Sequence, residues 1–232
     1  MQYFSEVSMN ILIIMVISYI VGSFPTSIIM ARKLAGIDIR EHGSGNAGMS
    51  NIIRVIGWKP GLIVGMVDTI KGWISTAVIP IIILSTKENS LLGLIQVLAG
   101  SSAVLGHTYT IFSRFRGGKG IATLAGMMVA LSPIAVFLCL ITFSGTLIRW
   151  GFVSLSSITA SVTLPLSLII IPYLGIGQPQ PSQSLLIFSL SVPIFVFFTH
   201  RENIHRLREG KEKGFANVVI FEGKKGRNKK ND

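Results

Sequence analysis

Charged residues are scarce in this chain. They make up 13% of its 232 residues, whereas soluble domains typically carry about 25%. Hydrophobic residues make up 50%, and the mean hydropathy is +0.63. The few charges are gathered in short blocks between apolar runs, and a membrane crossing needs roughly 20 apolar residues. The composition therefore argues against an ordinary soluble domain and predicts an all-α, polytopic membrane protein.

Cysteine is nearly absent, and the N-terminus lacks positive charge. The one cysteine, Cys139, lies inside an apolar run, so we expect neither a disulfide framework nor a Cys/His metal cluster. Residues 1–10 contain Glu6 but no Lys or Arg. Because a cleaved signal peptide begins with a basic segment, we expect the first apolar run to be retained as a membrane span.

The net charge of +11 raises the question of nucleic-acid binding. The cations, however, lie at the ends of the apolar runs and in the segment 201–232, which holds ten Lys and Arg residues. Cations in these positions mark the cytoplasmic side of a membrane protein and favour anionic lipid headgroups. We therefore expect membrane lipid, and no nucleic acid, among the partners.

The apolar runs predict the membrane spans. They cover residues 9–31, 60–84, 91–112, 120–148, 152–172 and 183–199. The fourth run is interrupted by Ser132–Pro133, and dividing it there gives two helices, 120–131 and 134–148. Because twelve residues rise only about 18 Å, the first of these two must be partly buried in protein. This division gives seven transmembrane helices.

The distribution of Lys and Arg orients these helices. With the N-terminus outside and the C-terminus in the cytoplasm, all Lys and Arg residues except Lys71 and Lys87 fall in cytoplasmic segments, as the positive-inside rule requires. Residues 1–212 are then a single transmembrane domain, and residues 213–232 are a basic cytoplasmic tail that we expect to be disordered. The glycines, histidines and asparagines of the loops are also inside, so we expect chemistry on the inner face.

The first inner loop, residues 42–51, reads His-Gly-Ser-Gly-Asn-Ala-Gly-Met-Ser-Asn. Its three glycines free the backbone to wrap N–H groups around an anion, and Ser44, Asn46 and Asn51 add side-chain donors. Arg54, which follows, can bind a phosphate with two N–H groups at once. The alternative is a flexible loop whose Ser and Asn residues cap the next helix.

A second inner loop, residues 112–120, reads Phe-Ser-Arg-Phe-Arg-Gly-Gly-Lys-Gly and opens a helix. A Gly-rich turn, a lysine and a helix N-terminus together form an anion site. The segment is not a Walker P-loop, which needs Gly at position 113 and Ser or Thr at position 120. We therefore expect phosphate binding without nucleotide hydrolysis. Positive-inside charge explains the two arginines but not the three glycines around the lysine: Gly117, Gly118 and Gly120 around Lys119.

Ionisable residues are also expected at membrane depth. Asp68 and Lys71 lie three residues apart in the second span, so they share a helical face, and such groups face partners or a cavity. They form either a structural ion pair that supports the site or a direct substrate contact, and the sequence leaves both open. We interpret His107, at the end of the third span, as a hydrogen-bonded structural residue.

Polar residues continue near the last spans. Ser157 lies among serines that either cap the next helix or reach the site. His200 and Asn203 are three residues apart, so they share a face at the cytoplasmic end of the last span. Arg201 and Arg206 have ordinary positions for cations beside a membrane.

Together these motifs resemble one family, the bacterial acyl-phosphate:glycerol-3-phosphate acyltransferases, or PlsY family. The resemblance runs from about Tyr19 to Glu212 and departs from the family's usual Ala-Thr at Met49-Ser50, where Ser keeps a hydroxyl. It rests on five motifs in order: Gly43-Ser-Gly-Asn-x-Gly-x-x-Asn51, Asp68-x-x-Lys-Gly72, Gly106-His with Phe-x-Gly-Gly-Lys-Gly-x-Ala-Thr123, Val153-Ser-Leu-x-Ser-Ile158 and His200-Arg-Glu-Asn-Ile204.

The resemblance implies a seven-helix enzyme of the bacterial inner (cytoplasmic) membrane that makes lysophosphatidic acid for phospholipid synthesis. It implies glycerol 3-phosphate and long-chain acyl phosphate as substrates, no cofactor and no metal, and suggests a soluble acyl-phosphate-forming enzyme as a partner. Motifs and resemblance together assign catalytic roles to Ser44, His200 and Asn203, substrate binding to Asn46, Asn51, Arg54, Gly117, Gly118, Lys119, Gly120 and Ser157, and supporting roles to Asp68, Lys71 and His107.

The chemistry of an acyl phosphate favours a simple mechanism. It is a mixed anhydride with a good leaving group, so direct attack by a glycerol hydroxyl is expected, with no protein nucleophile. The chain lacks the His-x-x-x-x-Asp dyad of acyl-CoA-type acyltransferases. The base is His200 or a substrate phosphate oxygen. A transporter of a phosphorylated metabolite predicts polar residues on both faces, and a membrane anchor leaves the glycine loops unexplained.

Overall fold

The structure is a computed structural model that describes residues 2–84, 91–175 and 180–215. Within these ranges all regular structure is helical, which confirms the predicted all-α class for this part of the chain. The tail from residue 216 onward lies outside the described residues, so its expected disorder stays a prediction. The helices are α1 (Gln2–Gly22), α2 (Thr26–Ala35), the 3-10 helix η1 (Ile39–Glu41), α3 (Met49–Val55), α4 (Trp58–Ala77), α5 (Ile79–Leu84), α6 (Leu92–Thr108), the 3-10 helix η2 (Ile111–Ser113), α7 (Ile121–Leu131), α8 (Pro133–Trp150), α9 (Val153–Tyr173), α10 (Gln183–Thr199) and α11 (Arg201–Arg208).

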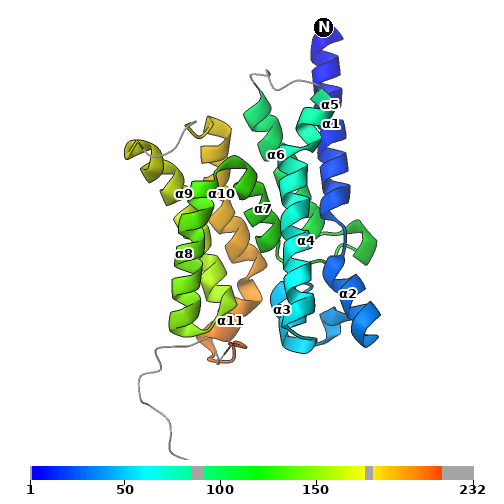
Figure 1. Cartoon of the computed structure of the whole chain (residues 1–232), viewed down its shortest axis with the longest axis vertical. Helices are drawn as coiled ribbons and strands as arrows, with labels where there is room; N and C mark the ends of the chain where they lie inside the picture. The colour runs from blue at the N-terminus through cyan, green and yellow to red at the C-terminus, as the bar shows by residue number, and fades with distance from the viewer. Residues whose placement is uncertain (1, 85–90, 176–179, 216–232) are drawn as a thin grey trace, which may run out of the picture.

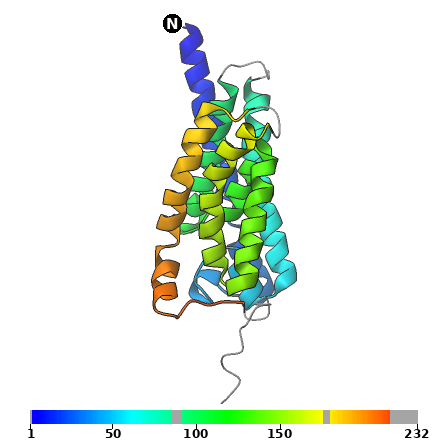
Figure 2. The same ribbon diagram turned by 90° about the vertical axis from the view of Figure 1, so that its left-hand side faces the viewer.

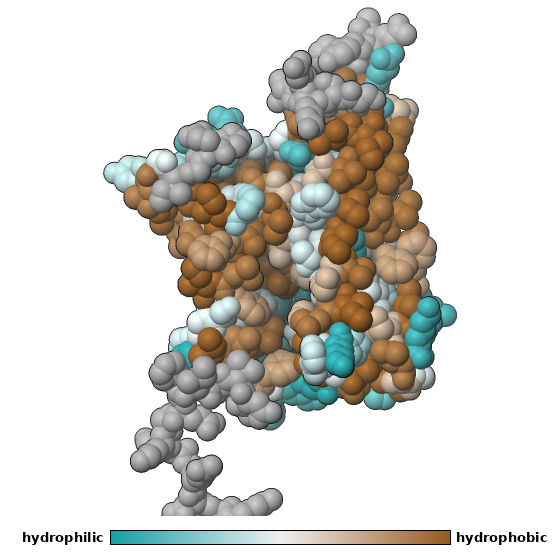
Figure 3. Space-filling view, viewed as in Figure 1, coloured by the Kyte–Doolittle hydropathy of each residue, from teal (hydrophilic) through white to brown (hydrophobic). Residues whose placement is uncertain are grey.

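The long helices run side by side along one axis, and the short helices α2, α3 and α11 gather at the end opposite the N-terminus (Figures 1 and 2). Apolar residues, brown in Figure 3, cover much of the side of the molecule between the two ends. Among the described helices, four segments are long and apolar enough to cross a membrane, and the pair α10 and α11, bent by 61°, is a fifth candidate. The four are Glu6–Ala35, Trp58–Leu84, Pro133–Trp150 and Val153–Tyr173.

The first predicted span is interrupted near its end. Residues 9–31 read as one apolar run, but α1 and α2 are separate helices with Pro25 between them. Pro25 has no N–H group with which to continue the helical hydrogen bonds. The carbonyl group of Phe24, just before it, accepts hydrogen bonds from the Thr26 N–H at 3.0 Å and from the Lys71 ammonium at 3.2 Å. The break therefore ties the first helix to α4.

The predicted division of the long fourth run is confirmed, since α7 ends at Leu131 and α8 begins at Pro133. The 11 residues of α7 rise only about 16 Å, and the helix packs tightly on α4. A Cβ atom added at Gly72 would lie 2.0 Å from the carbonyl oxygen of Thr123, and one added at Gly126 would lie 1.9 Å from that of Thr69. The expected burial of this short helix in protein is therefore confirmed.

A small apolar core supports the loop between η1 and α3. It joins buried residues of α2, η1, α3 and α4 to Ala47, which belongs to the loop itself. The other members include Ile28, Ile39, Ile52 and Val64. Because one of its own residues is anchored in this core, the loop is held firmly at the end of the bundle where the short helices gather.

The contact between α4 and α7 leads to a prediction about stability. Gly126→Ala should lower the unfolding temperature of the detergent-solubilised protein, because overpacking typically costs about 1–3 kcal/mol and a backbone carbonyl has little room to move. Gly145→Ala in α8 is the matched control, since no atom lies within 4 Å of its added Cβ. Tryptophan fluorescence during heating measures both. Equal unfolding temperatures for the two variants would contradict the tight contact.

Candidate active site

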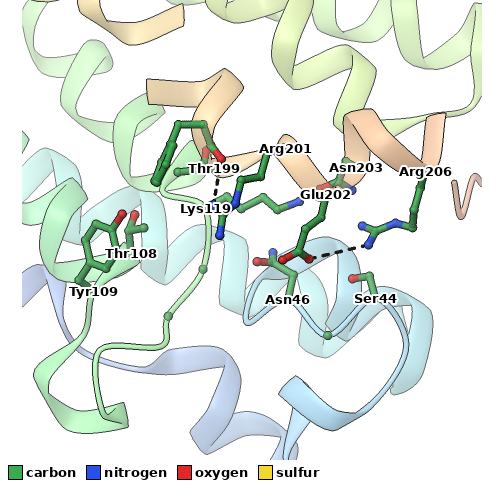
Figure 4. A pocket seen from close by; sticks show the side chains of 14 residues that line it. Ser44, Asn46, Thr108, Tyr109, Lys119, Thr199, Arg201, Glu202, Asn203 and Arg206 are labelled. Atoms are coloured by element: carbon green, nitrogen blue, oxygen red, sulfur yellow. Dashed lines mark hydrogen bonds and ion pairs between the residues drawn. The ribbon is translucent and has the colours of Figure 1, made fainter. Parts of the chain in front are cut away.

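A cavity of about 310 Å³ opens among the loops at the end of the bundle where the short helices gather. Figure 4 shows Ser44 and Asn46 on one side of it, residues of α11 on the other side, and Lys119 reaching toward Asn203. Its lining comes from four parts of the chain: Ser44, Gly45 and Asn46; Thr108 and Tyr109; Gly117, Gly118 and Lys119; and Phe198, Thr199, Arg201, Glu202, Asn203 and Arg206.

The first loop is shaped by Asn51, which is completely buried. Its side-chain amide donates to the carbonyl oxygens of Ile39 and His42, at 3.1 and 2.9 Å, and its oxygen accepts a hydrogen bond from the Ser44 N–H at 2.8 Å. Gly43 has a φ of 63° and leaves no room for a Cβ beside this amide. Asn51 therefore fixes the loop from below, and Ser44 faces the cavity.

The glycines of the second loop allow it to pack on the end of α6. The N–H groups of Gly117 and Gly118 donate to the carbonyl oxygens of Thr108 and His107, at 3.0 and 3.2 Å. A Cβ at Gly118 would lie 2.2 Å from the His107 Nε2 atom. These two N–H groups are therefore already paired within the protein. The cation that this loop presents to the cavity is Lys119.

Asp68, Lys71 and His107 form a buried cluster directly behind the second loop. The Lys71 ammonium lies 2.8 Å from a carboxylate oxygen of Asp68 and 2.8 Å from the Nδ1 atom of His107. The Thr26 hydroxyl donates to the same carboxylate oxygen at 3.3 Å. None of the three cluster residues lines the cavity. Of the two interpretations that the sequence left open, the geometry favours a structural ion pair that supports the site.

A chain of hydrogen bonds links Lys119 to the segment after α11. The Lys119 ammonium donates to the side-chain oxygen of Asn203, whose amide donates to Glu212 at 2.6 Å. Glu212 also accepts hydrogen bonds from Ser154, at 2.7 Å, and from Arg206, at 2.9 Å. Burial lowers the pKa of Lys119 to about 8. Although burial alone would raise the pKa of Glu212, its hydrogen bonds lower it, so this carboxylate stays ionised.

Other predicted site residues lie close to the cavity but do not line it. His200, between α10 and α11, is buried, and its Nδ1 atom lies 2.9 Å from the carbonyl oxygen of Val196. Burial and the neighbouring Lys119 lower the pKa of His200 to about 4, so it is neutral at pH 7. Gly120 begins α7 with a φ of 79°. Ser157 lines a separate apolar pocket between α7, α8, α9 and α10, and Arg54 donates to the carbonyl oxygen of Lys213.

The structure thus brings together many of the residues that the motifs singled out. Six line the cavity: Ser44, Asn46, Gly117, Gly118, Lys119 and Asn203. The motifs missed Arg206 and Glu212 as part of the site. Arg206 lies three residues after Asn203 and six after His200, so extending the helical face by one turn would have found it. Glu212 lies beyond the last helix, where no periodicity applies. The individual roles of all these residues stay predictions.

Residues 12–210 match the family described as "Glycerol-3-phosphate acyltransferase". The chain belongs to this family. The match covers most of the sequence, and it confirms the resemblance inferred from the five motifs and the predicted enzyme class.

Individual glycerol-3-phosphate acyltransferases are similar over nearly their whole length. The enzyme of Chlorobium chlorochromatii (strain CaD3) is 40% identical over 228 residues, covering 88% of this chain and 96% of the relative. That of Salinibacter ruber is 38% identical, covering 94% and 98%. A crystal structure of PlsY (YgiH), an integral membrane glycerol 3-phosphate acyltransferase in its glycerol 3-phosphate form, is 33% identical with a TM-score of 0.77, covering 90% and 96%. Its lysophosphatidic acid form is 32% identical with a TM-score of 0.75, covering 90% and 97%.

The lowered pKa of Lys119 generates a prediction for this acyltransferase. If the charged ammonium binds substrate, kcat/KM for glycerol 3-phosphate should fall as the pH rises through about 8, because kcat/KM reports groups of the free enzyme. In Lys119→Arg the cation stays charged at all accessible pH values, so this decline should disappear even if the maximal rate is lower. A pH–rate profile from pH 6 to 10 measures both. The same decline in wild type and variant would assign it to another group.

Proposed function

We propose that this acyltransferase transfers a long-chain acyl group from acyl phosphate to a hydroxyl of glycerol 3-phosphate, giving lysophosphatidic acid and inorganic phosphate. Acylation of glycerol 3-phosphate is the activity for which the matched family is described, and the PlsY structures are described as glycerol 3-phosphate and lysophosphatidic acid forms. The observation that supports acyl phosphate as donor is the cation content of the cavity, which suits two phosphoryl groups. Lys119, Arg201 and Arg206 all line it.

The arrangement supports direct transfer without a covalent enzyme intermediate. The glycerol hydroxyl attacks the acyl carbonyl carbon, the bond to the phosphate oxygen breaks, and phosphate leaves with its electron pair. The Lys119 ammonium and the two arginines stabilise the negative charge that develops on the leaving group. Either the neutral imidazole of His200 or a phosphate oxygen of a substrate takes the hydroxyl proton. Ser44 orients the acceptor from the first loop.

The acyl chain has an apolar place beside this cavity. The separate pocket lined by Leu124, Met128, Cys139, Ser157 and other side chains has a volume of about 110 Å³ and is almost entirely apolar. α7 begins directly after Lys119 and Gly120, and α10 ends at the cavity-lining Thr199. We place the first carbons of the acyl chain between these two helices, with the rest of the chain extending into the bilayer.

We further propose that seven segments lie across the inner membrane, with the N-terminus outside and the C-terminus in the cytoplasm. Lys and Arg residues support this orientation, because nearly all of them lie at the end of the bundle that holds the cavity or in the tail. The acceptor would then reach the cavity from the cytoplasm, and the donor would reach it from the lipid.

The donor assignment is tested with purified protein in detergent. Palmitoyl phosphate and glycerol 3-phosphate should give lysophosphatidic acid in the presence of EDTA and without ATP. Neither the motifs nor the proposed chemistry requires a metal ion or a nucleotide. Palmitoyl-CoA at the same concentration should give no product above the no-enzyme control. Mass spectrometry of the extracted lipid measures both. Turnover that depends strictly on palmitoyl-CoA would overturn the proposed donor.

The orientation is tested with single cysteines in a Cys139→Ser background. Cysteines at positions 44 and 119 should react with a membrane-impermeant maleimide only from the cytoplasmic side, because both line one cavity. A cysteine in the outer segment, at position 87, should react only from the opposite side. Labelling intact cells and inverted vesicles in parallel distinguishes the outer side of the membrane from the cytoplasmic side. Labelling of residues 44 and 119 from different sides would exclude a shared phosphate site.

A further inference from the structure

The chain does not leave the site after its last helix. Beyond α11 it turns back across the end of the bundle, and Figure 2 shows this stretch passing beneath α8 and α9. We call residues 212–215 the C-terminal strap. The match to the family model ends at residue 210, just before the strap begins. Its contacts are nevertheless made with loops of the candidate site.

Two residues of the strap contact the first inner loop and the arginine that follows it. The Lys213 ammonium donates to the carbonyl oxygen of Gly43 at 2.6 Å. Arg54 donates from its Nη2 atom to the carbonyl oxygen of Lys213 at 2.9 Å. The Arg54 guanidinium also lies over the ring of Phe215, with its central carbon 4.9 Å from the ring centre.

The far end of the strap is anchored in a different part of the fold. The Phe215 N–H donates to the carbonyl oxygen of Gly151 at 2.9 Å, in the turn that joins α8 to α9. Glu212, at the near end, is held by Asn203, Arg206 and Ser154. Both ends of the strap are therefore fixed independently of the first loop, and from this support Lys213 reaches that loop and Phe215 reaches Arg54.

These contacts set the direction of Arg54 without using up its hydrogen-bonding capacity. A guanidinium has five N–H groups, and Arg54 uses one of them on the strap. Stacking on an aromatic ring fixes the plane of the guanidinium, and such contacts are worth about 0.5–1 kcal/mol at exposed sites. The Lys213 contact acts one residue before Ser44, which lines the cavity. The strap thus orients the guanidinium of Arg54 on α3 and the part of the first loop that carries Ser44.

We propose that Lys213 and Phe215 are positioning residues for the phosphate of glycerol 3-phosphate. Phe215 holds the Arg54 guanidinium in the orientation in which its free N–H groups face this phosphate, and Lys213 holds the loop that carries Ser44. Neither residue touches the reacting atoms. This inference rests on the proposed function, because it takes glycerol 3-phosphate as the acceptor and places its phosphate at the side of the cavity formed by the first loop.

The test compares full-length variants in the acyl phosphate assay. Phe215→Ala should raise KM for glycerol 3-phosphate about three- to fivefold, which corresponds to the loss of one cation–π contact. KM for palmitoyl phosphate and kcat should stay within about twofold of wild type. The unfolding temperature should stay within a few degrees of wild type. Phe215→Tyr keeps a ring under Arg54 and should restore the wild-type KM. Lys213→Met should raise the same KM and leave the donor KM unchanged.

Lys211→Met is the matched control, because this exposed lysine pairs with Glu209, at 3.1 Å, and not with the first loop. It should leave both KM values unchanged. An unchanged or lower KM for glycerol 3-phosphate in Phe215→Ala would overturn the inference, as would an equal rise in both KM values. Failure of the proposed function is a different result, since the wild-type protein would then form no product from acyl phosphate.

Discussion

The arrangement of this end of the molecule depends on the contacts of the buried Lys71 ammonium. It joins the Asp68 carboxylate on its own helix, the His107 ring at the end of α6 and the Phe24 carbonyl at the break between α1 and α2. Removing the Lys71 ammonium would leave the buried Asp68 carboxylate without its charged partner, and breaking a buried ion pair in this way typically costs about 3–5 kcal/mol of folding free energy. Three helices are thereby fixed at one point, and the second loop packs against that point through Gly118.

The position of Lys119 follows from this buried cluster. Because Gly117 and Gly118 are hydrogen-bonded to the end of α6, the lysine that follows them has a fixed starting point. Its ammonium then reaches Asn203, which is itself held by Glu212. The cavity is therefore assembled from both sides, by the buried cluster behind the second loop and by a carboxylate that follows the last helix.

Much of this was predictable from sequence, and the limits have identifiable causes. The all-α class and the division at Pro133 follow from hydropathy and proline chemistry, and the placement of cations puts the loops on one face. The convergence of Ser44, Lys119 and Asn203 in one pocket is what the family resemblance implied. The role of Asn51 could not be predicted, because a loop asparagine that donates to a ligand and one that donates to its own backbone have the same sequence pattern.

Residues beyond the last span were harder to assign for another reason. The 61° bend between α10 and α11 and the return of the chain after α11 bring Arg206 and Glu212 back to the site. The return of the chain has no periodic signature, so Glu212 could not be assigned. Arg206 does continue the helical face of Asn203, but its position beside the last span is also that of an ordinary juxtamembrane cation. The break at Pro25 was likewise hidden, because hydropathy averages over a window that is longer than the interruption.

The two glycines between α4 and α7 have a consequence for how this sequence can vary. Hydrophobic exchanges that keep the side-chain volume typically cost less than about 1.5 kcal/mol. At positions 72 and 126 a first side-chain carbon would lie only 2.0 and 1.9 Å from a carbonyl oxygen of the facing helix. Hydropathy does not decide there, because every other amino acid carries this first carbon and each of them would require the two helices to shift.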